Sequence, residues 1–290
     1  MNEFLKQHTC YDVLPISFKL VVFDTQLTVK KALGILVQNG IVSAPLWSSE
    51  KQEYAGMLTV SDFISLIQYY YTNPKLQQEI DHLRIYQLTK QDMTLSAHPT
   101  TTLFDAAVLM SQTRAHRIPL IDHGQTTMIV SILTQYRLLK FIASNFKQSE
   151  TLKTPLAELK IGTYGSHVAT AFMSTPVIQI IQLLANLNIS AVPIVDENGT
   201  VLNLYDTIDV MSLVRSEKYS GLDLPVSEIL KSRPKDYPGV CTCTLNDTLY
   251  SIFKAIRRKR VYRLVVIEPE TFKLIGLLSL SDILGHIVTL

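Results

Sequence analysis

The sequence predicts an α/β protein built from four copies of one β-α-β-β-α repeat. Three observations lead to this prediction. Two short landmarks recur along the chain at nearly the same period, and the hydrophobic pattern changes in the same order within each copy. Hydrophobic residues also make up 47% of the 290 residues, with only 11 Gly and 12 Pro. This composition is typical of a chain with a large buried core and not of a disordered one.

The two landmarks are an apolar strand segment and a segment that leads into a closing helix. The first occurs at 43–46, 117–120, 191–194 and 263–266, with aligned positions 45, 119, 193 and 265 and steps of 74, 74 and 72 residues. The second ends at positions 62, 137, 209 and 282, with steps of 75, 72 and 73 residues. Two landmarks with almost the same period indicate a true internal repeat.

Each copy begins with an extended segment and a helix, continues with two strands and ends with a second helix. In the second copy, for example, the apolar run 129–133 predicts a strand and 136–142 predicts the closing helix. A sheet of this size has one apolar face that a single copy cannot cover, so the copies are expected to pair.

The predicted domains follow from this pairing. The first module covers 1–148 and holds repeat 1 at about 12–73, an insertion at 74–96 and repeat 2 at about 97–148. The second module covers 149–290 and holds repeat 3 at about 155–219 and repeat 4 at about 224–290. Within the insertion, 76–80 predicts part of a helix.

The composition argues against several classes of ligand and several cellular locations. The net charge of +2 argues against a nucleic-acid-binding surface over the whole molecule, so any anion site must be local. The sequence has no apolar run near the length of a membrane span, and its first residues lack the order of a secretion signal. Cys10, Cys241 and Cys243 are too few and too poorly spaced for a disulfide framework or a zinc site. We therefore expect a reducing intracellular setting and no metal.

A repeat of this kind that ends in Gly-x-hydrophobic-Ser/Thr-x-x-Asp resembles the cystathionine-β-synthase (CBS) domain, whose pairs are called Bateman modules. More specific segments are Cys-Tyr-Asp-Val-Leu-Pro at 10–15, Lys-Leu-Val-Val-Phe-Asp at 19–24, and the segments 43–47, 161–164 and 278–284. Together they resemble the gamma regulatory subunit of AMP-activated protein kinase over essentially the whole chain, and the segment 133–137 favours a fungal relative.

This resemblance implies that the two Bateman modules form a flattened disc and that the chain is not an enzyme. It implies a regulatory subunit that binds AMP, ADP and ATP, without a metal, and relays the energy state to a kinase. The implied partners are a catalytic alpha-type subunit and a beta-type scaffold subunit, joined through a strand added to an open sheet edge. Neither a nucleic-acid partner nor a membrane span is expected. The expected location is the cytoplasm, with the nucleus as a second location.

Three aspartates end the second landmark and are candidate ribose ligands: Asp62, Asp209 and Asp282. A carboxylate at the start of a helix can accept hydrogen bonds from both ribose hydroxyls, while neighbouring strands hold the adenine. Arg137 stands at this position in repeat 2 and cannot accept ribose protons, so the second site is expected to be degenerate. Asp206 replaces the usual Ser or Thr in repeat 3, which weakens the prediction there. The alternative role of these aspartates is helix N-capping, and both roles can coexist.

Candidate phosphate ligands precede the first landmark in two repeats. His116 and Arg117 of repeat 2 match the His-Arg phosphate contact that the resemblance implies, whereas repeat 4 has Tyr262 and Arg263. Positive charge or backbone donors are required at such a place because phosphates are anionic. The other candidate nucleotide contacts, partly implied by the resemblance, are Ser43, Ala44, Met57, Thr59, Thr163, Ser190, Ala191, Ser279 and Ser281.

The sequence offers no candidate for catalysis. It has no Gly-x-x-x-x-Gly-Lys loop, Gly-x-Ser-x-Gly elbow or His-Glu-x-x-His motif, and its seven histidines are scattered singly. The basic run 254–260 is predicted to be the solvated face of a helix that buries Ile252, Phe253 and Ile256. Two alternative functions stay open: an assembly scaffold of the kinase with weakened nucleotide sites, and a CBS-pair regulator of another enzyme or transporter.

Overall fold

The computed structural model describes residues 1–73, 82–88, 95–124, 127–146, 150–215, 221–233, 237 and 239–289. The helix expected at 76–80 lies outside these residues. The chain forms two compact units. Unit 1 comprises Met1–Lys19, Leu95–Val168 and Gly239–Leu290, and unit 2 comprises Leu20–Thr94 and Ala169–Pro238. Repeats 2 and 4 thus lie together in unit 1, and repeats 1 and 3 in unit 2.

This division cuts across the predicted modules. Repeat 1 was expected to pair with repeat 2 through their sheets, and repeat 3 with repeat 4, but the members of each expected pair belong to different compact units. What holds each unit together is instead the packing of its helices, described below. The pairing of repeats 1 with 2 and 3 with 4 stays a prediction.

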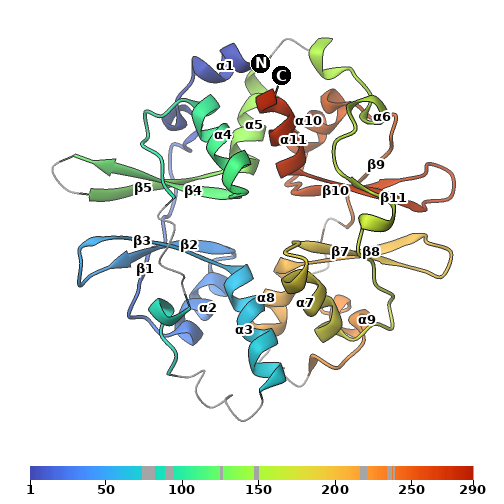
Figure 1. Cartoon of the computed structure of the whole chain (residues 1–290), viewed down its shortest axis with the longest axis horizontal. Coiled ribbons are helices and arrows are strands. Elements are labelled where there is room, and N and C mark those ends of the chain that lie inside the picture. The colour runs from blue at the N-terminus through green and yellow to red at the C-terminus, as the bar shows by residue number, and fades with distance from the viewer. Residues whose placement is uncertain are drawn as a thin grey trace. The chain divides into compact units, whose positions relative to one another are not determined.

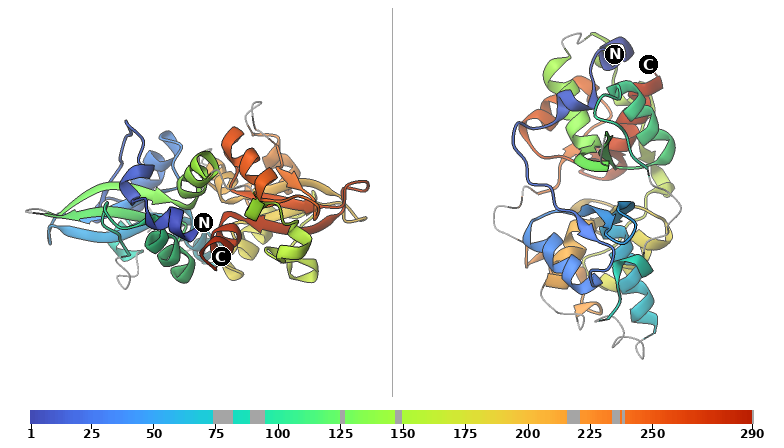
Figure 2. Two further views of the ribbon diagram at one scale, coloured as in Figure 1. Left: turned by 90° about the horizontal axis from the view of Figure 1, so that it is seen from above. Right: turned by 90° about the vertical axis from the view of Figure 1, so that its left-hand side faces the viewer.

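Unit 1 consists of helices on one side of two sheets, a two-stranded sheet β4-β5 and a four-stranded sheet β6-β11-β10-β9 (Figures 1 and 2). Short 3₁₀ helices occur at Cys10–Val13, Glu150–Leu152 and Gly165–His167. The helices and strands in chain order are α1 (Asn2–Lys6), α4 (Leu103–Thr113), β4 (Arg117–His123), β5 (Thr127–Thr134), α5 (Gln135–Asn145), α6 (Leu156–Leu159), β6 (Thr163–Tyr164), β9 (Thr242–Cys243), α10 (Leu249–Arg258), β10 (Arg263–Ile267), β11 (Leu274–Ser279) and α11 (Leu280–Thr289).

Unit 2 has the same layered construction, with a three-stranded sheet β1-β2-β3 and a two-stranded sheet β7-β8 (Figure 1). A short 3₁₀ helix lies at Ile85–Gln87. The helices and strands are β1 (Phe23–Asp24), α2 (Val29–Gln38), β2 (Ser43–Ser48), β3 (Glu53–Thr59), α3 (Val60–Thr72), α7 (Val177–Asn186), β7 (Ala191–Val195), β8 (Val201–Asp206), α8 (Thr207–Arg215) and α9 (Val226–Leu230).

The repeat predicted from the two landmarks is present in the backbone. Each copy contains an antiparallel hairpin, and each hairpin has one irregularity in its register. These irregularities fall at equivalent places, between 46 and 47, 120 and 121, 194 and 195, and 266 and 267. Bulges bend and twist a hairpin at a defined residue. The four copies therefore share a bend as well as a hydrophobic pattern, and the predicted mixed α/β fold is confirmed.

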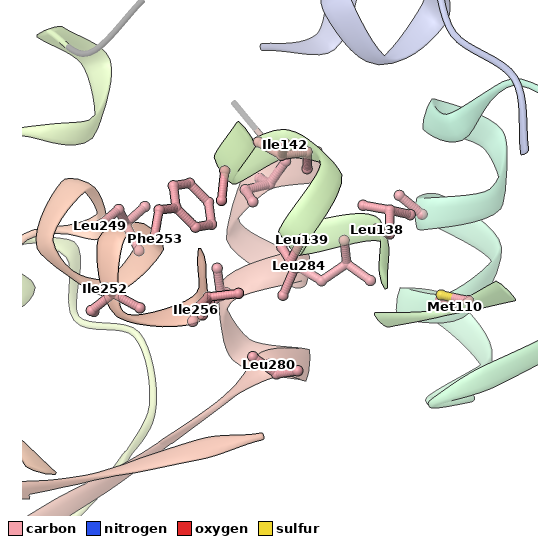
Figure 3. Close-up of a cluster of buried hydrophobic side chains, with 14 of the residues drawn as sticks. Met110, Leu138, Leu139, Ile142, Leu249, Ile252, Phe253, Ile256, Leu280 and Leu284 are labelled. Atoms are coloured by element: carbon pink, nitrogen blue, oxygen red, sulfur yellow. The ribbon is translucent and has the colours of Figure 1, made fainter. Parts of the chain in front are cut away.

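The core of unit 1 is the interface between its helices. Helix α5 packs against α10 and α11, and α11 also packs against α4. Their buried faces alternate with polar residues at helical spacing, as expected for amphipathic helices. Figure 3 shows this core, with Met110, Leu138, Leu139, Ile142, Leu249, Ile252, Phe253, Ile256, Leu280 and Leu284 labelled. The prediction that helix α10 buries Ile252, Phe253 and Ile256 and exposes its basic residues is confirmed.

The core of unit 2 has the equivalent arrangement. Helix α3 packs against α7 and α8, and α2 also contacts α8. Its buried residues include Phe63, Ile64, Ile180, Ile181 and Val210. The closing helices α3 and α8 therefore meet within this unit, and each of them begins close to one of the candidate aspartates.

The residues directly before each repeat's first helix pair in parallel with the strand that follows that helix: β1 with β2, Ala97 with Leu120, Ala171 with Ile194, and β9 with β10. A second set of bridges joins segments of consecutive repeats. Isolated bridges join Thr9 to Thr102, Thr28 to Arg84, Pro155 to Thr248, and Pro176 to Pro225. Residues 155–168, at the start of predicted repeat 3, belong to unit 1, whereas residues 224–238, at the start of predicted repeat 4, belong to unit 2. These four bridges therefore join segments that follow one another along the chain within a unit, and they do not link repeat 2 to repeat 4 or repeat 1 to repeat 3.

A tight backbone contact fixes strand β6 on strand β11. Gly276 lies opposite Tyr164, whose hydroxyl donates to the carbonyl of Ile161 at 2.7 Å. A Cβ on Gly276 would lie 2.5 Å from the carbonyl oxygen of Thr163 and would also collide with the ring of Tyr164.

Replacing Gly276 by alanine should therefore lower the free energy of unfolding by about 1–3 kcal/mol, the usual cost of overpacking. Urea unfolding of both proteins measures it. Gly285→Ala is the control, because its Cβ would meet nothing nearer than 3.6 Å. If Gly276→Ala were as stable as this control, strand β6 would not be held as described.

Among the described residues, no helix is both long and apolar enough to cross a membrane.

Candidate functional site

The carboxylates of Asp62 and Asp282 occupy equivalent places at the starts of helices α3 and α11. The Oδ2 atom of Asp62 accepts hydrogen bonds from the backbone N–H of Thr59 at 2.7 Å and from its hydroxyl at 2.8 Å. The Oδ2 atom of Asp282 accepts the same two bonds from Ser279, at 2.8 and 2.6 Å. Both aspartates thus perform the capping role that the sequence left open as an alternative.

Capping uses only one oxygen of each carboxylate. Within the described part of the chain, the Oδ1 atoms of Asp62 and Asp282 accept no hydrogen bond. Burial raises the pKa of Asp62, and the hydrogen bonds from Thr59 oppose that rise. A partly buried carboxylate oxygen without a donor is able to accept a hydroxyl group from a ligand. The capping and ribose-binding roles are therefore compatible in repeats 1 and 4.

Repeat 3 is built differently. The Oδ2 atom of Asp209 accepts from the backbone N–H of Asp206 at 2.9 Å, so its capping bond is retained. However, Arg233 binds both carboxylate oxygens of Asp209, with Nε 2.7 Å from Oδ1 and Nη2 2.6 Å from Oδ2. The two side chains are only 10% and 7% exposed. Asp209, predicted as a ribose ligand, is the acid of a buried bidentate ion pair in this structure.

Repeat 2 places Arg137 where the other repeats have aspartate. Its backbone N–H donates to the hydroxyl of Thr134 at 3.1 Å, and its Nη1 donates to the carbonyl of Ile132 at 2.8 Å. A guanidinium only donates hydrogen bonds. This geometry gives the predicted degenerate position a structural role, since the side chain ties the start of α5 to strand β5.

Unit 1 brings the candidate phosphate ligands of repeats 2 and 4 together. The Nδ1 atom of His116 lies 3.3 Å from the hydroxyl of Ser281 and 3.3 Å from Oε1 of Gln135, and Ser281 donates to Gln135 at 3.0 Å. Ser281 is the residue before Asp282. His116 of one repeat therefore contacts the residue that precedes the capping aspartate of the other.

Several cations surround this triad of side chains. The positive charges of Arg117 and Arg263 lower the pKa of His116, after the larger effect of burial. Burial likewise lowers the pKa of Arg117, and the charge of Arg260 adds to that shift. The guanidinium of Arg260 lies 5.5 Å from the centre of the Tyr262 ring. Like charges gathered in one place favour a bound anion.

Arg117 is the clearest of these cations. It begins strand β4, and its side chain is half-buried. Among the described residues, it forms no side-chain hydrogen bond and no salt bridge. Burial of an unpaired guanidinium is unfavourable, so this position gains most from an external anion.

The remaining candidate contacts are divided between the units. Ser43 and Ala44 are buried on strand β2, and Met57 and Thr59 are half-buried on β3. Ser190 precedes strand β7, and Ala191 is buried at its start. All six belong to unit 2, as do Asp62 and Asp209. The candidates in unit 1 are Thr163, Ser279, Ser281, Asp282, His116, Arg117, Arg137, Tyr262 and Arg263.

Three residues of these clusters were not singled out from the sequence. Gln135 is only 4% exposed although it is polar, and Arg260 was assigned only to a solvated helix face. Arg233 stands 24 residues after its partner Asp209. The only indication of Arg233 in the sequence was Asp206, which stands where the other repeats have Ser or Thr. A second acid close to Asp209 is stabilised by a nearby cation.

His116 gives this cluster a predictable response to pH. Because burial and nearby cations lower its pKa below 6.5, the free imidazole is neutral near pH 7. Its contribution to stability is complete above the unfolded pKa and is lost as the pH falls through the lowered folded pKa. A bound phosphate would favour the charged ring, so binding of a ligand that carries phosphate to unit 1 should be accompanied by proton uptake at His116.

Calorimetry in buffers of different ionisation enthalpy measures this uptake. His116→Gln, just before strand β4, should remove it, whereas His123→Gln, at the end of that strand, should not. Equal proton uptake in wild type and His116→Gln would contradict the placement of phosphate at His116.

The three cysteines were expected to form neither a disulfide framework nor a zinc site. Cys10 and Cys243 are buried, Cys241 is half-buried, and all three are free. Burial raises the pKa of both Cys10 and Cys243 to about 12, so these thiols stay protonated and serve packing. In the part of the chain that the structure describes, no three His, Cys, Asp or Glu side chains gather as metal ligands do.

Comparison with known proteins identifies the family. The CBS domain family matches residues 12–69, 91–144, 164–216 and 226–289. The chain is 44% identical to the 5'-AMP-activated protein kinase subunit gamma of Saccharomyces cerevisiae, over 99% of this chain and 92% of that protein. It is 46% identical to the Kluyveromyces lactis subunit of the same name, over 99% and 91% of the two chains.

A solved structure from Methanocaldococcus jannaschii, described as an archaeal homologue of the gamma subunit, has the same fold. It superposes with a TM-score of 0.79 at 13% identity, over 96% of this chain and 99% of that one. The four matched CBS segments agree with the four repeats found from the two landmarks. The chain belongs to the CBS-domain family and, within it, to the gamma regulatory subunits of AMP-activated protein kinase.

Proposed function

We propose that this non-catalytic subunit binds adenine nucleotides through the starts of its closing helices and its cationic cluster. The observation that carries the proposal is the arrangement in unit 1. There the capping carboxylate of Asp282 follows Ser281, whose hydroxyl lies 3.3 Å from His116 of another repeat. A candidate phosphate ligand thus contacts the residue next to a candidate ribose acceptor, and a nucleotide needs both kinds of ligand in one site.

We propose AMP, ADP and ATP as the regulatory ligands. The unpaired Arg117, with Arg260 and Arg263 nearby, offers more positive charge than one monophosphate neutralises, which supports binding of longer phosphate chains as well. Ligands that bind in turn to the same place can regulate a kinase only if each favours a different state of the complex. Competition among these nucleotides is therefore the proposed signal.

We also propose the partners and the location. The relatives are named as subunits of a kinase, so a catalytic alpha-type and a beta-type subunit are the proposed partners. Strand β1 is an edge of its sheet, and the exposed apolar side chain of Val22, in the same unit, precedes it. A partner strand added at this edge would cover apolar surface. We place the complex in the cytoplasm and the nucleus.

Titration with AMP, ADP and ATP by calorimetry tests the nucleotide proposal. Asp282→Ala should reduce AMP binding by one equivalent or lower its affinity at least tenfold, because a charge-assisted grip on ribose is lost. Asp12→Ala is the matched control. Asp12 accepts the same two bonds from Thr9, at 2.7 and 3.0 Å, and within the described part of the chain no hydrogen bond or ion pair joins it to a candidate ligand.

Two outcomes would contradict the proposal. Absence of binding by all three nucleotides in a folded wild-type chain would favour the alternative of an assembly scaffold. Equal loss of binding in Asp282→Ala and Asp12→Ala would show that the effect comes from the capping bonds and not from contact with a ligand. Co-purification of the kinase subunits with Asp282→Ala separates sensing from assembly, because sensing predicts that the complex stays intact.

A further inference from the structure

The three candidate aspartates share a backbone position but differ in what their second oxygen binds. In repeats 1 and 4, the Oδ1 atoms of Asp62 and Asp282 accept no hydrogen bond from a described residue. In repeat 3, Oδ1 of Asp209 accepts from Nε of Arg233 at 2.7 Å. Only in repeat 3, therefore, is the oxygen that would meet a ribose hydroxyl already occupied by the protein.

The neighbouring sequence explains why repeat 3 needs this arginine. Thr59 and Ser279 each donate a hydroxyl to their aspartate, but the equivalent residue in repeat 3 is Asp206. A carboxylate cannot donate, and its negative charge raises the pKa of Asp209 in addition to the larger effect of burial. Two acids close together in a buried site are stabilised by a nearby cation, and the guanidinium of Arg233 is that cation.

The guanidinium is held firmly in place. Its Nη1 donates to Oδ1 of Asn203 at 2.7 Å, and its Nη2 also donates to the carbonyl of Leu204. The ring of Tyr237 lies 4.1 Å from the centre of the guanidinium. The guanidinium thus donates four hydrogen bonds and carries an aromatic ring on one face, and the bidentate geometry with Asp209 is the strongest form of such a pair.

We propose that Arg233 is an internal competitor of nucleotide at repeat 3, and that it keeps this site closed. A ribose and Arg233 require the same oxygens of Asp209, so the two cannot bind at once. This inference rests on the proposed function, because it assumes that the Asp209 carboxylate would otherwise bind ribose. It concerns repeat 3, whereas the Asp282→Ala test concerns repeat 4. The carboxylate-dependent nucleotide sites of the folded chain are then those of Asp62 and Asp282.

Removal of the competitor tests this inference. In a chain with Asp62→Ala and Asp282→Ala, only Asp209 can bind ribose through a carboxylate, and we expect little AMP binding by calorimetry. Adding Arg233→Gln, which removes the charge but keeps a polar side chain, should raise AMP affinity at least tenfold. Adding Asp209→Asn as well should abolish that gain. Lys231→Gln is the matched control, because Lys231 pairs with Glu228 on the surface at 2.7 Å and does not touch Asp209.

A gain of binding in Arg233→Gln that depends on Asp209 supports the inference, whatever the wild type does at repeats 1 and 4. Absence of that gain in a folded protein overturns it, as does Asp209-dependent binding with Arg233 still present. Failure of the proposed function would appear separately, as wild-type binding that Asp282→Ala leaves unchanged.

A second measurement covers the case in which Arg233→Gln does not fold. The Nε–H resonance of Arg233, assigned by Arg233→Lys in a ¹⁵N-arginine-labelled chain, should stay unchanged when AMP saturates the wild-type protein. A shift or loss of that resonance at saturation would show that AMP displaces the arginine, and would overturn the inference of a closed site.

Discussion

Replacing Arg233 by alanine is expected to lower the free energy of unfolding by about 3–5 kcal/mol, the cost of leaving a buried charge without its partner. The Asp209 carboxylate would lose two hydrogen bonds at 2.6 and 2.7 Å, and only the capping bond from Asp206 would remain. Unfolding in urea, followed by circular dichroism, measures the loss. Because the chain has two compact units, the transition must be tested for an intermediate before one free energy is assigned.

Two further variants show whether the loss of stability comes from the unpaired buried charge. Lys231→Ala breaks a surface ion pair two residues away and should cost no more than about 1 kcal/mol. The double variant Arg233→Met with Asp209→Leu replaces both charges by apolar groups and should be closer to wild type than either single variant, since a lone charge is what destabilises. A loss below about 1 kcal/mol in Arg233→Ala would indicate that water reaches the carboxylate and that the pair is not buried in solution.

The second large effect concerns ligand binding. Arg117→Gln is expected to weaken binding of AMP, ADP and ATP to unit 1 by a factor of roughly 10 to 100, since a hydrogen bond to a charged group contributes about 1.5–3 kcal/mol. The guanidinium of Arg117 has no hydrogen-bond or salt-bridge partner among the described residues, so its removal breaks no such bond there. Stability should therefore change little, or increase slightly, because burial of an unpaired charge is unfavourable.

Adenosine separates this effect from a general disturbance of the site. It has the ribose and the base but no phosphate, so its affinity should be the same for wild type and Arg117→Gln. Arg114→Gln is the matched control, because Arg114 is exposed and follows helix α4 only three residues earlier. Loss of adenosine and AMP binding to the same extent would contradict a phosphate role for Arg117.

Much of this fold was predictable from one sequence because the elements of each repeat depend on residues that are close together in the chain. The hydrophobic period sets strands and helices within each copy, and the landmark at 43–46 and its three equivalents set the hairpins. The capping aspartates were also predictable, since a carboxylate three residues after Ser or Thr is a local signature of a helix start. The binding of Arg233 to Asp209 was not, because that contact joins a residue of helix α8 to one in the segment after helix α9, and its only local sign is the acid at 206.

The sequence by itself determined that this protein has four β-α-β-β-α repeats, that three closing helices start with an aspartate and one with an arginine, and that His116 and Arg117 precede a strand. Only the tertiary structure decided which repeats share a compact unit and which carboxylate oxygens are free. The physical reason is that hydrophobic periodicity and helix capping depend on residues within one turn or one strand. Which repeats pack together, and which side chain binds a buried carboxylate, depends on apolar helix faces and charges that lie far apart in the sequence.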